Sequence, residues 1–275
     1  MATTYSDFIR RQTQWAIREG LEVDGDYLGL YDDNLFEPLS PQALIDFTDA
    51  DGGELKSNMR TMCSSPALAV NVFHYWSRIN WLARKPMHEA FGDVRAKSDI
   101  RFEYKLQYPL TDRPKIDVAL IVCDESEQDS TAAIYAIESS LTEWITSKRY
   151  DFGRGYFHGV DLWTQANLPQ CQSLVQDIYD GRQEFNYLRA DQLLKHALGL
   201  ATEFQGRSQL LYLYYDLADE PVCQDHRDEI DQFRSRVGDE IHFKPMTYQD
   251  LFQTLVESCG TNHKTYMDYL AMRYF

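Results

Sequence analysis

Apolar side chains recur at helical spacing through the first hundred residues. Ser6, Ser40 and Ser65 each stand ahead of such a run, and serine is a favoured helix N-cap. Proline follows the second and third of these serines and suits the first turn of a helix. Residues 1–99 are therefore predicted to be mostly helical, with a long buried helix from Ala67 to Trp81. The helix after Ser40 is expected to place three apolar side chains on one face, Leu44, Ile45 and Phe47.

The hydrophobic period changes to two at residue 100. Apolar and polar side chains alternate over 100–106, the apolar run 116–123 suits a strand covered on both faces, and 132–140 is a third strand. Residues 149–169 have no clean period and predict an irregular excursion. Helical spacing is expected over 174–178 and then over 187–198, ending near Gly206. Further helices are expected over 225–237, 247–255 and 264–274, and strands over 210–217 and 241–243. No repeat or linker divides the chain, which predicts one mixed α/β domain over 1–275 with an N-terminal helical layer.

Two acidic residues stand on neighbouring predicted strands. Asp117 begins the run 116–123, and Glu138 lies near the end of 132–140. Carboxylates that meet at strand ends can hold one divalent cation, and such a cation can activate water against a phosphodiester. Each residue also has a structural interpretation, since Asp117 could bond a turn beside Pro114 and Glu138 could be paired or exposed at the sheet edge.

Charge and cysteine content narrow the function classes. The formal net charge is −16 and the isoelectric point is about 4.8, so the chain lacks the basic footprint of a broad nucleic-acid-binding surface. A local cleft can still be positive, or be made so by a metal ion. The five cysteines form no Cys-Xaa-Xaa-Cys pair, which argues against a zinc site or a disulfide framework. Without an eighteen-residue apolar run or a signal-peptide core, the protein is expected in the cytoplasm and not in a membrane.

Several short motifs match one known pattern. They are Gly53-Glu54-Leu55, Ser64–Phe73, Phe102–Lys105, Ile116-Asp117, Ile137-Glu138-Ser139 with Thr142-Glu143-Trp144, and Gln192-Leu193-Leu194. Through these motifs most of the chain resembles a bacterial branch of the PD-(D/E)XK superfamily of restriction-endonuclease-like nucleases. The resemblance implies a mixed β-sheet core flanked by helices and hydrolysis of DNA that depends on Mg²⁺ or Mn²⁺.

The resemblance also implies roles for particular residues. The implied metal ligands are Asp117, Glu138 and the backbone carbonyl of Ser139. Glu54 is the implied accessory acid from an upstream helix, although it could also begin a helix and favour its dipole. Gln192 is expected from the helix after the sheet core; with His196, four residues on, it could address a phosphate or face water. Six other histidines do not cluster at ligand spacing: His74, His88, His158, His226, His242 and His263.

Ser140 departs from the superfamily pattern. Most members carry a lysine at this position, and the lysine stabilises developing negative charge, which a serine hydroxyl cannot do. Lys105 is the first candidate to replace it, because its strand is expected to pair with the strand of Asp117. Lys115 and Lys148 are weaker candidates. Lys105 and Glu103 could instead form an exposed strand face.

Two classes of function remain open. The first is a metal-dependent nuclease in which Ser140 weakens catalysis. The second is a degenerate nuclease fold kept for binding or regulation, with the acidic surface facing a protein partner; Ser140 and the negative charge favour it. The tyrosine stripe Tyr212, Tyr214 and Tyr215 is more typical of a core than of a base-stacking platform. The chain contains no Gly-rich phosphate loop, Gly-Xaa-Ser-Xaa-Gly elbow or His-Glu-Xaa-Xaa-His motif that would indicate an unrelated enzyme.

Overall fold

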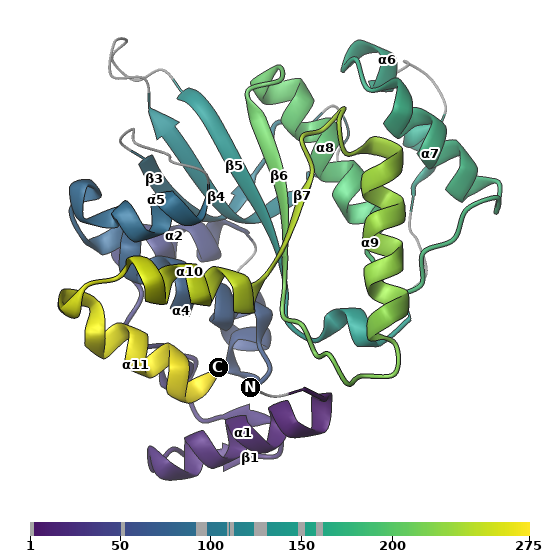
Figure 1. Ribbon diagram of the computed structural model, residues 1–275. Coiled ribbons are helices and arrows are strands. Elements are labelled where there is room, and N and C mark those ends of the chain that lie inside the picture. Colours follow the sequence, from purple (N-terminus) through teal and green to yellow (C-terminus); the bar gives the residue numbers. More distant parts are fainter. Residues whose placement is uncertain are drawn as a thin grey trace.

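A mixed five-stranded sheet runs through the centre of the protein (Figure 1). The computed structural model describes residues 3–50, 53–91, 98–108, 110, 113–123, 131–147, 152–157 and 162–275. The sheet order is β3 (Ser98–Lys105), β4 (Lys115–Cys123), β5 (Thr131–Ser140), β6 (Ser208–Tyr214) and β7 (Lys244–Thr247). β3, β4 and β5 are antiparallel, whereas β5, β6 and β7 are parallel. The parallel pairing of β5 and β6 requires a long crossover, which residues 141–207 supply.

Helices cover both faces of this sheet (Figure 1). Because strand side chains alternate, Val118 and Ile137 join one hydrophobic core while Ala119 and Ala136 join the other. The first face carries α2 (Pro41–Ala50), α4 (Ser65–Arg78), α5 (Lys85–Ala90), α10 (Tyr248–Ser258) and α11 (Lys264–Arg273). The second face carries α6 (Leu162–Gln165), α7 (Pro169–Tyr179), α8 (Ala190–Phe204) and α9 (Cys223–Val237). The remaining α-helices and strands are α1 (Tyr5–Arg18), the hairpin β1 (Val23–Asp24) and β2 (Tyr27–Leu28), and α3 (Gly53–Lys56).

The predicted mixed α/β class, a sheet flanked by helices with a mostly helical first part, is confirmed. Three details of the first helices are wrong. Ser64, not Ser65, caps α4, because the Ser64 side chain accepts the Ala67 N–H. Thr4, not Ser6, caps α1, because the Thr4 side chain accepts the Asp7 N–H. In α2, Phe47 is buried, but Leu44 and Ile45 are 41 % and 51 % exposed, so the three do not share a buried face.

The helical spacing expected over 174–178 and 187–198 corresponds to two helices, α7 and α8, and the chain turns between them at Gly181, whose φ is +69°. One later element prediction needs correction. The expected strand over 241–243 is displaced, and the pairing with β6 begins at Lys244. Parts of the 149–169 segment lie outside the described residues. The single-domain organisation remains a prediction.

Arg273 of α11 connects the C-terminal helix to α1 and to the segment around Asn34. Its side chain is fully buried, and its guanidinium donates to Gln12 Oε1 at 3.1 Å, to the Asn34 carbonyl at 2.7 Å and to the Tyr269 hydroxyl at 2.6 Å. A further bond reaches Asn34 Oδ1. The guanidinium carbon also lies 3.8 Å from the centre of the Trp15 ring, a cation–π distance. Neutral acceptors and an aromatic face therefore solvate this buried charge.

Candidate functional site

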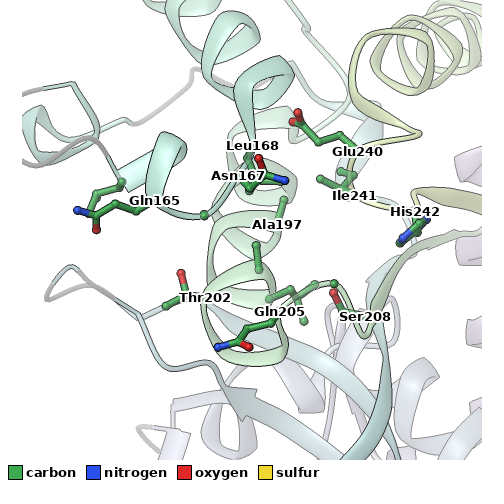
Figure 2. A pocket seen from close by; sticks show the side chains of 15 residues that line it. Gln165, Asn167, Leu168, Ala197, Thr202, Gln205, Ser208, Glu240, Ile241 and His242 are labelled. Carbon is green, nitrogen blue, oxygen red and sulfur yellow. The ribbon is translucent and has the colours of Figure 1, made fainter.

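Two large cavities lie against helix α8, and they differ in chemistry. The first, about 550 Å³, is bounded by the C-terminal half of α8, the loop after α6 and the turn before β7 (Figure 2). Of its described lining residues only Glu240 is acidic, and none is lysine or arginine. Glu240 already accepts the N–H groups of Gln170 and Cys171 at 2.9 and 2.8 Å. This cavity thus offers little charged chemistry.

The second cavity, about 410 Å³, lies where the first residues of β4 meet the last residues of β5. Its lining is strongly charged with both signs. The carboxylates are Glu54, Glu103, Asp117, Glu138 and Glu143, and the basic side chains are Arg113, Lys115, Arg189 and Lys195. A concave site in which acids and bases converge is the natural candidate for function in this chain.

Strand register brings Asp117 and Glu138 to the same end of the sheet. Val118 of β4 lies opposite Ile137 of β5 in an antiparallel pair, so the next residues outward are Asp117 and Glu138. The Ser139 N–H donates to Asp117 Oδ2 at 2.7 Å, which fixes that carboxylate against β5. Asp117 is half-buried, and Glu138 is 7 % exposed.

The electrostatics of these two carboxyl groups are unfavourable for charge. Burial raises the pKa of Asp117 well above its usual value, and the negative charge of Glu103 raises it further. Burial also raises the pKa of Glu138, the nearby Asp117 adds to this shift, and Arg189 opposes it. A site that holds two carboxyl groups with raised pKa values gains from any cation placed between them.

Glu103 enters the site through an irregularity in β3. It lies between the pairs Phe102–Val118 and Tyr104–Ile116, and its φ is +46°, a left-handed conformation that is uncommon for a residue other than glycine. Such a backbone costs about 1 kcal/mol. Glu103 Oε2 lies 3.5 Å from Lys115 Nζ, so an acidic and a basic group of the cavity lie in contact. Backbone strain of this kind tends to cluster at functional sites.

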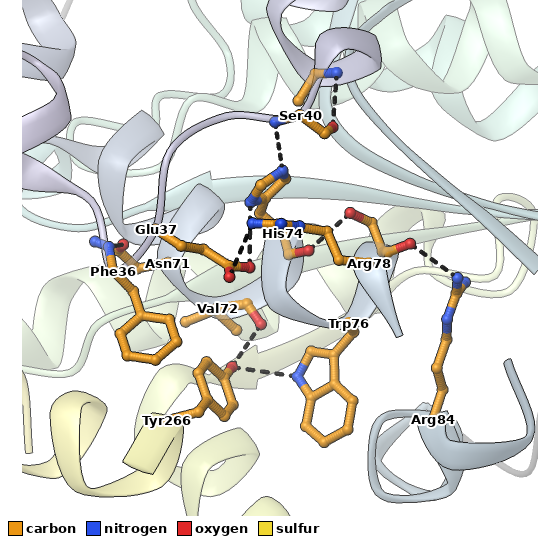
Figure 3. Close-up of polar contacts among 12 residues, drawn as sticks. Phe36, Glu37, Ser40, Asn71, Val72, His74, Trp76, Arg78, Arg84 and Tyr266 are labelled. Atoms are coloured by element: carbon orange, nitrogen blue, oxygen red, sulfur yellow. Dashed lines mark hydrogen bonds and ion pairs between the residues drawn. The ribbon is translucent and has the colours of Figure 1, made fainter. Parts of the chain in front are cut away.

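Helix α4 brings Ser65 onto the last residues of β5. Ser64 caps the helix by accepting the Ala67 N–H, and the Ser65 hydroxyl donates to the Ser139 carbonyl at 2.8 Å. Farther along the helix, His74 Nε2 accepts the Ser40 N–H at 2.9 Å, and the Tyr266 hydroxyl donates to the Val72 carbonyl at 2.7 Å (Figure 3). Burial lowers the pKa of His74 to about 4, which keeps its imidazole neutral. These contacts hold α4, and with it Ser65, against the sheet.

Helix α8 supplies the opposite wall through Gln192, Lys195 and His196. The turn before it is fixed by Glu229 of α9, whose carboxylate accepts the N–H groups of residues 186–188 at 2.6 to 2.8 Å. Gly199 allows close packing, because a Cβ there would lie 2.8 Å from Leu106 Cδ1. Lys195 Nζ lies 5.9 and 5.8 Å from two aromatic rings, those of Phe152 and Tyr156.

Glu143 follows β5 in a short 3-10 helix, Glu143–Ile145. Its Oε2 accepts the N–H groups of Leu141 and Thr142 at 2.8 and 3.0 Å, and the Ser140 hydroxyl lies 3.4 Å away. Ser140 is buried. The Glu143 carboxylate therefore holds the turn after β5 by accepting its N–H groups. It also adds a further negative charge to the cavity.

Most residues singled out from the sequence line this cavity. Those that do are Glu54, Asp117, Glu138, Ser139, Ser140, Gln192 and Lys115. Lys105 does not line it; that side chain is exposed, and its ammonium donates to the backbone carbonyl of Asp49. Lys148 lies outside the described residues. Sequence reasoning did not assign Arg113, Arg189 or Lys195 to the site, since single basic residues in loops and on a helix give no periodic signal.

The donor atoms of the cavity suit a hard divalent cation. Glu138 Oε2 and Glu54 Oε2 are buried and have no hydrogen-bond partner. Among the described residues, no three His, Cys, Asp or Glu side chains are grouped closely enough to enclose a metal by themselves. Mg²⁺ commonly binds through one or two carboxylates, several waters and substrate phosphate, so Asp117 and Glu138 fit that requirement.

The chain belongs to the family described as "Restriction Endonuclease associating with ARP", which matches residues 9–275. This places it among restriction-endonuclease-like proteins, in agreement with the mixed sheet and flanking helices. No curated protein and no solved structure matches. Within the described residues, no helix is both long and apolar enough to span a bilayer.

Proposed function

We propose that this protein is a nuclease that hydrolyses phosphodiester bonds of DNA with Mg²⁺ or Mn²⁺ held by Asp117 and Glu138. The observation that carries the proposal is the buried Glu138 carboxylate, whose Oε2 has no hydrogen-bond partner within a cavity edged by basic side chains. An anionic backbone would meet that basic edge, and a cation would compensate the buried carboxylates. Membership of a restriction-endonuclease family supports the same chemistry.

The residues of the cavity divide between the ion and the substrate. A divalent ion bound here would lower the pKa of a coordinated water and so supply hydroxide near neutral pH. Asp117 and Glu138 would hold it, with the Ser139 carbonyl, which also accepts the Ser65 hydroxyl, as a further oxygen. Glu54, with its unpaired Oε2, would orient the water.

The positive charge that Ser140 lacks would come from the basic wall of the cavity. Lys195 is the strongest candidate, because it lines the cavity on the same helix as Gln192 and forms no ion pair with a described residue, while its Nζ lies 5.9 and 5.8 Å from two aromatic ring centres. Lys115 also lines the cavity but already contacts Glu103. Lys105 stays a prediction, and its position outside the lining favours Lys195.

Cleavage assays on the full chain test the proposal. Purified protein is incubated with single- and double-stranded DNA in the presence of Mg²⁺, Mn²⁺ or excess chelator. Cleavage with either ion that stops with chelator is the expected result. Failure to cleave either substrate with either ion, by protein that is folded and binds the metal, would contradict the nuclease assignment and support the binding or regulatory alternative.

Replacing Lys195 should separate catalysis from metal binding. We expect Lys195→Met to lower the cleavage rate by about 10²-fold, the usual effect of losing one charged contact to the transition state, while the Kd for Mn²⁺ stays unchanged. Single-turnover rates would be measured beside Lys264→Met, an exposed lysine on α11 that pairs with Asp268. A loss of rate in Lys105→Met and not in Lys195→Met would instead assign the charge to Lys105.

The family description also mentions association with ARP. If this chain associates likewise, its net charge of −16 favours a basic surface on the partner.

A further inference from the structure

His196 lies inside the candidate site, and one of its ring nitrogens makes no hydrogen bond to a described residue. The side chain is 1 % exposed on α8, and its Nδ1 lies 3.4 Å from Glu138 Oε2. Neither atom has a hydrogen-bond partner, although both are buried. Two unsatisfied polar atoms that face each other in a protein interior are costly unless something sits between them or joins them.

The other ring nitrogen fixes the tautomer. The imidazole hydrogen-bonds the backbone carbonyl of Lys115, and because Nδ1 has no partner this bond comes from Nε2–H. The Nδ1 atom of the neutral ring then carries a lone pair and lies 3.4 Å from Glu138 Oε2. Metal-bound histidines typically have this arrangement, with the second ring N–H held by a carboxylate or a backbone carbonyl.

The separation of the two atoms matches two ligands of one ion. Bonds of about 2.1 Å from a metal to a histidine nitrogen and to a carboxylate oxygen place those atoms about 3.0 Å apart at a right angle and about 3.4 Å apart at a tetrahedral angle. The observed separation is 3.4 Å. Without a metal ion or a shared proton between them, Nδ1 and Oε2 would instead place two lone pairs against each other.

We propose that His196 Nδ1 is a direct ligand, beside Glu138, of the metal ion in this site. Because Asp117 is not grouped closely enough with these two side chains to enclose an ion together with them, it would reach the ion by a side-chain adjustment or through a bound water. The inference rests on the proposed metal centre and adds which metal ion that centre binds more tightly. An imidazole nitrogen among oxygen ligands favours a first-row transition-metal dication over Mg²⁺, which prefers oxygen and retains its waters. Mn²⁺ is therefore expected to bind at least about tenfold more tightly than Mg²⁺.

Electron paramagnetic resonance with Mn²⁺ tests the ligand directly. The full chain is titrated with Mn²⁺ alone, without DNA, and the loss of the free-ion signal gives the Kd. Electron spin-echo modulation of the bound ion should show a directly bonded ¹⁴N nucleus, and labelling of histidine with ¹⁵N should shift that modulation. These readouts do not depend on turnover.

The matched variants are His196→Gln and His74→Gln. His74 is an equally buried histidine of α4 that does not line the cavity, and a glutamine oxygen can still accept the Ser40 N–H there. We expect His196→Gln to lose the nitrogen modulation and to weaken Mn²⁺ binding by about 10- to 100-fold, with a smaller change for Mg²⁺. His74→Gln should retain both the modulation and the Kd.

Each other outcome has a definite meaning. Tight Mn²⁺ binding to the wild-type chain without ¹⁴N modulation would overturn the role of His196 and leave the carboxylate site intact; His196 would then share a proton with Glu138. No binding of Mn²⁺ or Mg²⁺ to folded protein would remove the metal centre and the proposed function together. Because the wild-type spectrum already decides the first case, the test holds even if His196→Gln does not fold.

Discussion

Asp117→Asn should reduce metal-dependent DNA cleavage by about 10³-fold or more. The substitution removes a negative charge that the proposed ion requires, and electrostatic contacts of this kind are commonly worth two to three orders of magnitude in rate. The asparagine oxygen can still accept the Ser139 N–H, which is 2.7 Å from Asp117 Oδ2, so the strand pairing should persist. The loss would therefore report on the charge and not on the fold.

Single-turnover cleavage with saturating Mn²⁺ would measure this effect. Asp268→Asn serves as the control, because Asp268 is an exposed partner of Lys264 on α11. Both variants should unfold at a urea concentration close to that of the wild-type chain. Wild-type cleavage by Asp117→Asn would remove Asp117 from the site and with it the proposed mechanism.

Arg273→Met should lower the free energy of unfolding by about 3 to 5 kcal/mol. Methionine can fill much of the volume but donates no hydrogen bond, so Gln12 Oε1 and Asn34 Oδ1 lose their donor in a buried place. The Asn34 carbonyl keeps only the donation from Asn71 Nδ2. Each unsatisfied buried acceptor costs about 1 to 3 kcal/mol. The contact between the guanidinium and the Trp15 ring is lost as well.

Urea unfolding followed by tryptophan fluorescence would give that free energy. Arg10→Met is the matched control, since Arg10 is 69 % exposed and its pair with Asp7 lies at the surface, where such pairs contribute about 0 to 1 kcal/mol. A decrease in the free energy of unfolding below about 1 kcal/mol for Arg273→Met would contradict this. It would mean that water replaces the guanidinium and that Arg273 does not hold α11 against α1.

Local sequence patterns were sufficient to predict the central strands and to place Asp117 and Glu138 on two neighbouring strands. The alternation after residue 100 and the apolar run after Asp117 depend on burial that repeats every second residue, which a single sequence displays directly. The same patterns placed the helices α4 and α10, although the cap of α4 is Ser64 and not Ser65. These features require no knowledge of the distant parts of the chain.

The other wall of the cavity could not be read in this way. His196 and Lys195 reach the site because α8 crosses back over the sheet between the parallel strands, and that placement depends on tertiary packing. The left-handed backbone of Glu103 has no sequence signal, because glutamate rarely adopts it. The failed grouping of Leu44 with Phe47 arose because apolar residues at neighbouring helix positions need not face the core.

The long crossover between β5 and β6 is expected to make the pairing of these two strands a late step in folding. β3, β4 and β5 follow one another in the chain, so their antiparallel contacts close short loops, whereas Glu138 of β5 meets β6 only after some seventy intervening residues have been arranged. Closing the longer loop carries a greater entropic cost, and high contact order slows the search. We therefore expect the acidic end of the sheet to form early, in water, and to lose its hydration late, when α8 docks.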